Sequence, residues 1–154
     1  MSGDIKVKWQ QYFRNIAYQV KTKSKDNYTQ IGAVIVGLDN EIVSTGYNSF
    51  PRKINDDVAT RQERPEKYYW FEHAERNAIY NAARIGVSTN NCTMYLTCGI
   101  PCADCARGII NAGIRRVVCE PNLSFGARGN LWEEHAKRSL IMFEEAGVQI
   151  DYYE

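Results

Sequence analysis

Apolar residues recur at spacings of three and four over residues 5–23. This period predicts an amphipathic helix whose apolar stripe is formed by Trp9, Tyr12, Phe13, Ile16 and Val20. Two β-rich segments follow at residues 30–36 and 41–47. The turn residues at 37–40 between them indicate an antiparallel hairpin.

The periodic pattern stops between residues 48 and 71. This stretch contains Pro51, Pro65, many charged residues and an aromatic cluster at its end. It predicts a long irregular segment, and long loops in compact domains are often functional.

Helical and strand patterns alternate in the rest of the chain. Helices are predicted at residues 73–85, 102–112 and 131–146, each followed by a glycine, and short strands at residues 93–97, 116–119 and 148–152. Strand–helix–strand units connect parallel strands by right-handed crossovers. The alternation therefore predicts an α/β fold, with a mixed sheet covered by helices on both faces.

Composition and charge narrow the class of protein. The 154 residues are expected to form one domain spanning 1–154, and a hydrophobic content of 44% is typical of a globular chain. The net charge of +1 argues against a polynucleotide partner, because neutralising phosphates supplies most of that affinity. The first residues lack the features of a secretory signal, and no apolar run is long enough to span a membrane. We therefore expect a cytoplasmic protein whose five cysteines serve metal binding or catalysis.

Two short motifs carry the candidate chemistry. Cys102 and Cys105 are three residues apart in the first turn of a predicted helix, so both sulfurs fall on one face. His73 begins another helix, and two helix starts can meet at one ion. One imidazole and two thiolates suit zinc, whose catalytic sites leave the fourth tetrahedral position to water.

Glu75, two residues after His73, cannot comfortably bind the same ion from that turn, but it can reach the ion's water. Two thiolates offset the charge of zinc, so a carboxylate is needed to take the proton of that water. His-x-Glu followed by Pro-Cys-x-x-Cys is the pattern known from zinc deaminases. The alternative is a purely structural zinc site completed by Cys98, which leaves Glu75 without a role.

The chain resembles the deoxycytidylate (dCMP) deaminase branch of the cytidine and deoxycytidylate deaminase superfamily. The resemblance covers roughly residues 28–120, and its matching stretches are residues 31–36, 46–48 with Pro51 and Asp56–Asp57, 73–79, and 101–105 running on to 109–114. It implies a three-layer α/β/α sandwich around a mixed five-stranded sheet, and hydrolysis of dCMP to dUMP and ammonia through zinc-activated water.

The resemblance also implies roles for individual residues. His73, Cys102 and Cys105 would hold zinc, and Glu75 would be the catalytic proton shuttle. Asn48 would bind the sugar or base edge, and the backbone amide of Ala74 would face the pyrimidine carbonyl. A homo-oligomer, with a hexamer favoured, and regulation by dCTP and dTTP are further implications.

The chain departs from the branch at Ser49, where glycine is usual. Residues 49–71 contain no Cys or His that could bind a second metal, so one zinc per chain is expected. Several basic residues could bind the phosphate of a substrate: Arg52, Lys53, Arg61, Arg64 and Lys67. Arg76 is favoured over these by its position beside Glu75.

Several alternatives stay open. The aromatic run from Tyr68 to Phe71 could stack on a base or form core beneath the loop. His135 is expected to be a solvated surface residue because charged residues surround it. The substrate could instead be a nucleoside, guanine or tRNA adenosine, and the chain could be a catalytically silent, zinc-stabilised nucleotide-binding module.

Overall fold

A computed structural model of the chain describes residues 6–121 and 129–154, and its centre is a five-stranded sheet. The strands lie in the order β2-β1-β3-β4-β5, with β1 antiparallel to both its neighbours and β3, β4 and β5 parallel. Their bounds are Gly32–Val36 (β1), Ile42–Tyr47 (β2), Thr93–Leu96 (β3), Arg116–Cys119 (β4) and Gln149–Tyr152 (β5). The predicted mixed sheet is therefore confirmed.

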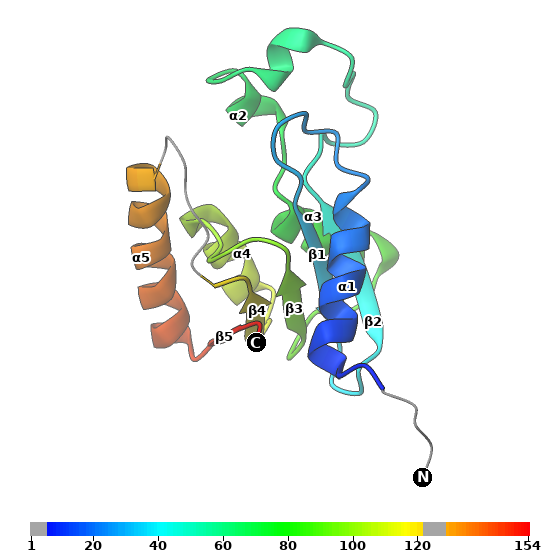
Figure 1. Cartoon of the computed structure of the whole chain (residues 1–154), viewed down its shortest axis with the longest axis vertical. Coiled ribbons are helices and arrows are strands. Elements are labelled where there is room, and N and C mark those ends of the chain that lie inside the picture. The colour runs from blue at the N-terminus through cyan, green and yellow to red at the C-terminus, as the bar shows by residue number, and fades with distance from the viewer. Residues whose placement is uncertain (1–5, 122–128) are drawn as a thin grey trace.

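Helices cover both faces of this sheet (Figure 1). α1 lies on one face, whereas α3, α4 and α5 lie on the other, which gives the predicted three layers. The helices are Trp9–Lys21 (α1), Lys67–Trp70 (α2), Ala74–Ile85 (α3), Ala103–Asn111 (α4) and Gly129–Ala146 (α5), and the short 3-10 helix η1 spans Ala59–Gln62. No helix within the described ranges is long and apolar enough to cross a bilayer.

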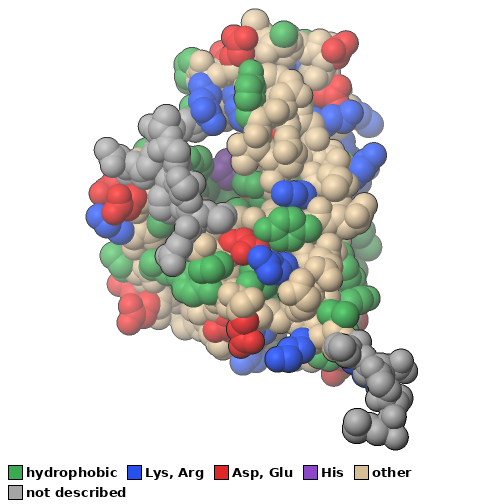
Figure 2. Space-filling view, viewed as in Figure 1, with side chains coloured by type: hydrophobic (Ala, Val, Ile, Leu, Met, Phe, Trp, Pro, Cys, Tyr) green, Lys and Arg blue, Asp and Glu red, His purple; other side chains and the backbone are tan. Residues whose placement is uncertain are grey.

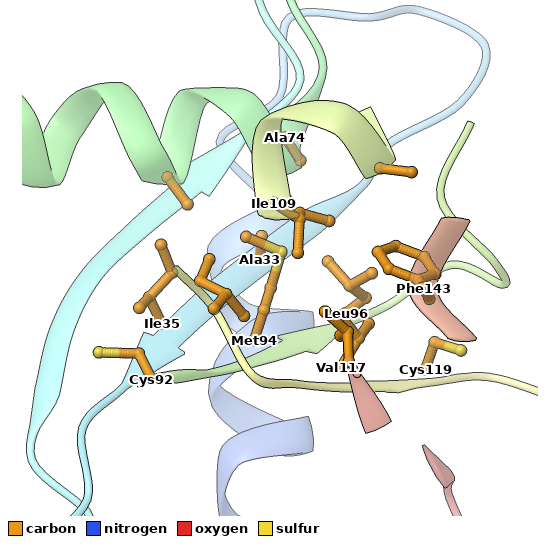
Figure 3. Close-up of a cluster of buried hydrophobic side chains, with 14 residues drawn as sticks. Ala33, Ile35, Ala74, Cys92, Met94, Leu96, Ile109, Val117, Cys119 and Phe143 are labelled. Atoms are coloured by element: carbon orange, nitrogen blue, oxygen red, sulfur yellow. The ribbon is translucent and has the colours of Figure 1, made fainter. Parts of the chain in front are cut away.

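β1 connects the two hydrophobic cores because all five of its residues are buried. Ala33 and Ile35 join the core beneath α3, α4 and α5, which also contains Met94, Leu96, Ile109 and Phe143 (Figure 3). Val34 and Val36 point to the opposite face and pack with residues of α1. The continuous apolar run in the sequence thus becomes a strand buried on both sides.

α3 packs unusually close to the sheet at Gly46 of β2. A Cβ atom at Gly46 would collide with the backbone of α3, at the nitrogen of Ala78 and the oxygen of Ala74. The absence of a side chain at this position lets α3 lie directly against the strand. The start of α3 is therefore placed by β2.

Gly46→Ala should lower the stability of the protein, because the added methyl group pushes α3 away from β2. Overpacking of this kind costs about 1–3 kcal/mol. Thermal unfolding of the two variants would measure the effect. Gly108→Ala is the matched control, since a Cβ at Gly108 would make only ordinary contacts, the nearest at 3.6 Å, and should leave the melting temperature unchanged or raise it. Equal melting temperatures for the wild type and Gly46→Ala would contradict the proposed steric role.

The main difference from the sequence prediction lies in residues 48–71. This segment is not irregular throughout but contains η1 and α2, and it rises above the sheet at the top of the molecule (Figure 1). The first helix begins at Trp9 rather than residue 5, and residues 1–5 lie outside the described residues. Short helices such as α2 depend on contacts with distant parts of the chain, which a local pattern does not contain.

Candidate metal centre and active site

The starts of α3 and α4 bring three metal-binding side chains together. His73 is the residue immediately before α3, and Cys102 is the residue immediately before α4. Nδ1 of His73 lies 3.5 Å from Sγ of Cys102 and 3.3 Å from Sγ of Cys105. The three ligand atoms lie within 4.8 Å of one another, as the motif spacing predicts.

These distances fit a zinc ion. With Zn–S bonds of about 2.3 Å and a Zn–N bond of about 2.0 Å, tetrahedral geometry places nitrogen and sulfur about 3.5 Å apart. In the part of the chain that the structure describes, no fourth His, Cys, Asp or Glu joins this group. Cys98 is therefore not in the cluster, which argues against the closed structural site and leaves one corner for water.

The two thiol groups affect each other's pKa in opposite directions. The hydrogen bond from Cys105, supported by His73, lowers the pKa of Cys102, and the same interaction raises the pKa of Cys105. The hydrogen bond with Cys102 also raises the pKa of His73. A divalent cation deprotonates the thiols that bind it, and the lowered pKa of Cys102 favours that step.

Glu75 lies in the first turn of α3, is only 3% exposed, and has one unused oxygen. Its Oε1 atom is buried and has no hydrogen-bond partner within the described residues. Burial raises the pKa of its carboxyl group, although the nearby charge of His73 opposes this. A buried carboxyl group with a raised pKa and a free oxygen can both accept and return a proton.

Arg76 and Glu72 flank the metal-binding residues. The Arg76 guanidinium forms a 2.6 Å ion pair with Oε1 of Glu72, and the same oxygen accepts the backbone N–H of His73 at 3.0 Å. Nε of Arg76 is buried and lacks a partner within the described residues. Arg76 is therefore fixed beside the centre, and its contact with a substrate stays a prediction.

The side chain of Asn48 is buried at 7% exposure and fully hydrogen-bonded. Its Oδ1 accepts from Ser24 Oγ at 2.7 Å and from the Ile31 amide at 2.8 Å, and its Nδ2 donates to the Thr29 carbonyl at 2.7 Å and Oδ2 of Asp26 at 3.4 Å. A contact with substrate would require one of these bonds to be exchanged. The proposed substrate role of Asn48 stays a prediction.

The backbone amide of Ala74 is placed differently. Ala74 is the first residue of α3, so its N–H has no acceptor within the helix. A carbonyl oxygen of a ligand could supply the missing acceptor.

The basic residues of segment 48–71 are mostly engaged with the protein. Lys67 forms a 2.6 Å ion pair with Asp26, and both side chains are at most 10% exposed, so its charge is already paired within the protein and a contact with phosphate stays a prediction. Arg61 stacks 3.7 Å from the ring centre of Trp70, and Arg52 donates to Asn81. Burial and ion pairing decide which basic side chain is available to a substrate phosphate, and the sequence pattern reveals neither.

The aromatic run at the end of the segment divides between core and surface. Phe71 packs against Phe50, with ring centres 4.3 Å apart. Tyr69 is 82% exposed. Phe71 is half-buried and packs within the protein, and base stacking by the run stays a prediction.

His135 is half-buried and hydrogen-bonded, so the prediction of a solvated surface residue is wrong. Its Nδ1 accepts the backbone N–H of Ala103, the first residue of α4, at 3.0 Å. The two residues are 32 positions apart, and no spacing or motif connects them in the sequence. Seen from the side shown in Figure 2, the surface is recessed below segment 48–71, and one of the chain's two histidines is visible in the recess.

Most of the chain is similar to known proteins. Residues 7–120 fit the family model of the cytidine and deoxycytidylate deaminase zinc-binding region. The chain is 38% identical to human deoxycytidylate deaminase over 150 residues, which cover 94% of this chain and 79% of the relative. It is 40% identical over 146 residues to an uncharacterised deaminase encoded in the luxG 3′ region of Aliivibrio fischeri, covering 94% and 93%.

Solved structures share the fold. The crystal structure of dCMP deaminase from the cyanophage S-TIM5 in complex with dCMP and dUMP superposes with a TM-score of 0.75. The superposition covers 97% of this chain and 100% of that one at 19% identity. The arrangement of sheet and helices is thus common to both molecules.

Proposed function

The chain belongs to the cytidine and deoxycytidylate deaminase family, and from this we propose that it hydrolyses dCMP to dUMP and ammonia. The observation that carries the proposal is the buried, unpaired oxygen of Glu75 beside the cluster of His73, Cys102 and Cys105. A structural zinc site has no use for such a carboxyl group. The names of the deoxycytidylate deaminase relatives support dCMP as the substrate.

His73, Cys102 and Cys105 would hold one zinc ion per chain. Bound zinc supplies a Lewis acid that makes a coordinated water molecule more acidic. The rest of the chemistry is proton transfer and orientation by this chain's own residues.

Glu75 would carry the proton through the reaction. Its carboxylate takes a proton from the attacking water, and the carboxyl group then protonates the ring nitrogen of the pyrimidine. The second proton of the water follows the same route to the leaving amine, so that water and dCMP give dUMP and ammonia. Burial supports both directions of transfer, because it raises the pKa of Glu75.

Three further residues would orient the nucleotide. The N–H of Ala74 would donate to the pyrimidine carbonyl, and Asn48 would hold the sugar or base edge. Arg76 is charged, held close to the centre and only partly paired, which supports a contact with the phosphate. These three roles are proposed from where the residues lie in the fold.

The family resemblance also supports a homo-oligomer, with a hexamer favoured, and control by dCTP and dTTP. Two alternative functions use the same metal centre. The protein could deaminate a nucleoside, guanine or tRNA adenosine, or it could be a catalytically silent module that only binds a nucleotide. The net charge of +1 counts against tRNA.

A substrate panel tests the proposed function. The zinc-loaded protein is incubated with dCMP, deoxycytidine, dCTP, cytosine and guanine, with and without a chelator, and ammonia release is measured. We expect turnover to be highest with dCMP, to stop with the chelator and to return with zinc. Equal rates for dCMP and deoxycytidine would refute the phosphate preference, and no turnover of any substrate would favour the silent module. Adding dCTP or dTTP to the same assay tests regulation.

A further inference from the structure

The first turn of α4 is held from two directions. A helix start leaves several backbone N–H groups without acceptors inside the helix. Here Sγ of Cys102 accepts from the Cys105 amide at 3.5 Å, within the turn itself. The Ala103 amide instead donates to Nδ1 of His135, which lies on α5, at 3.0 Å.

This second bond is part-buried, and its donor belongs to a buried residue. Ala103 is 9% exposed and Cys102 is 5% exposed, so water has little access to the amide between them. A buried N–H group without an acceptor is costly. Without the imidazole of His135, the start of α4 would have to shift toward another acceptor, and Cys102 would move with it.

The His135 ring also lies beside an aromatic neighbour on its own helix. Trp132, one turn earlier on α5, lies with its ring centre 5.8 Å from that of His135. Because Nδ1 accepts a hydrogen bond, the neutral ring carries its proton on Nε2. The ring therefore presents a fixed acceptor to α4.

We propose that His135 is a positioning residue for the metal centre. Its Nδ1 fixes the first turn of α4, and that turn carries both thiol ligands, Cys102 and Cys105. Outer groups that orient metal ligands commonly affect metal affinity or activity about 10- to 100-fold. α5 thus takes part in metal binding although it contributes no ligand.

The test compares zinc affinity in three variants of the full chain, measured by competition with a chelator. In His135→Asn, Oδ1 is bonded to Cγ as Nδ1 is in histidine, so the acceptor is retained. His135→Leu keeps bulk but removes the acceptor. We expect zinc to bind about 10-fold more weakly to His135→Leu and almost normally to His135→Asn. Lys137→Ala is the matched control, because Lys137 lies on the same helix with a side chain 62% exposed, and its affinity should not change.

Two outcomes would overturn the proposal: unchanged zinc affinity in His135→Leu, or an equal loss in His135→Asn. Should His135→Leu fail to fold, His135→Gln replaces it, since its acceptor lies one bond further out. Zinc must then bind more tightly to the Asn variant than to the Gln variant.

The zinc comparison does not depend on the proposed function; if that function holds, His135→Leu should also lose dCMP turnover at limiting zinc, and this second effect rests on the proposed function. A wild type that binds zinc but turns over no dCMP would defeat the proposed function and leave the zinc comparison intact. A wild type that deaminates dCMP, with unchanged zinc binding in His135→Leu, would defeat the positioning role alone.

Discussion

Glu75→Gln should reduce dCMP turnover about 10²- to 10⁴-fold while zinc remains bound, which is the range expected for losing a general acid–base group. Glutamine preserves the size of the side chain but cannot take up and return a proton. Because Glu75 is buried and lies outside the ligand cluster, the change leaves the three ligands in place. Steady-state turnover and metal content, measured on the same preparation, would check both parts of this expectation.

Glu145→Gln is a suitable control, since Glu145 is exposed on α5. It should have wild-type turnover and zinc content. Unchanged turnover in Glu75→Gln would remove the role of Glu75 as proton shuttle. Loss of zinc together with loss of folding would show that the residue supports a structural site instead.

Lys67→Met should destabilise the protein by about 3–5 kcal/mol, the range for removing one partner of a buried ion pair. The Asp26 side chain is only 4% exposed in the structure, and the variant removes its counter-charge. Asp26 also accepts the amides of Tyr28 and Thr29 and the Asn48 side chain, so the loop at residues 24–31 should loosen as well. Chemical denaturation of the zinc-loaded protein would measure the change in the free energy of unfolding.

The chain offers a matched control for this experiment. Lys25 and Asp56 form an ion pair of 3.8 Å whose side chains are 60% and 44% exposed, and Lys25→Met should cost less than about 1 kcal/mol. Adding Asp26→Asn to Lys67→Met should recover part of the lost stability, because asparagine retains an acceptor oxygen but carries no charge. A double variant less stable than Lys67→Met would show that charge burial is not the cause.

Local sequence patterns predicted most of the fold. The strand β4 begins and ends where predicted, and Gly86 and Gly147 follow the ends of α3 and α5 as expected. These elements are specified by residues close together in the chain. The sequence did not predict α2. Lys67, in the first turn of α2, is paired with Asp26, which lies 41 positions earlier in the chain, and a local pattern does not contain such a contact.

In the candidate site, too, the sequence predicted what nearby residues determine and missed the contacts between distant segments. The motif spacing predicted that His73, Cys102 and Cys105 meet, because helix geometry fixes where neighbouring ligands point. The spacing could not show that Lys67 is buried or that His135 contacts α4. Both facts depend on how distant segments pack, and the pattern of a single sequence carries no signal for such contacts.

The ligand arrangement also has a consequence for folding. His73 and Cys102 are 29 residues apart, and the chain between them includes α3 and β3. An ion held by both ends would close that stretch into a ring, and ring closure restricts the unfolded chain far more than the folded one. By mass action, the midpoint of thermal unfolding should then rise with the concentration of free zinc.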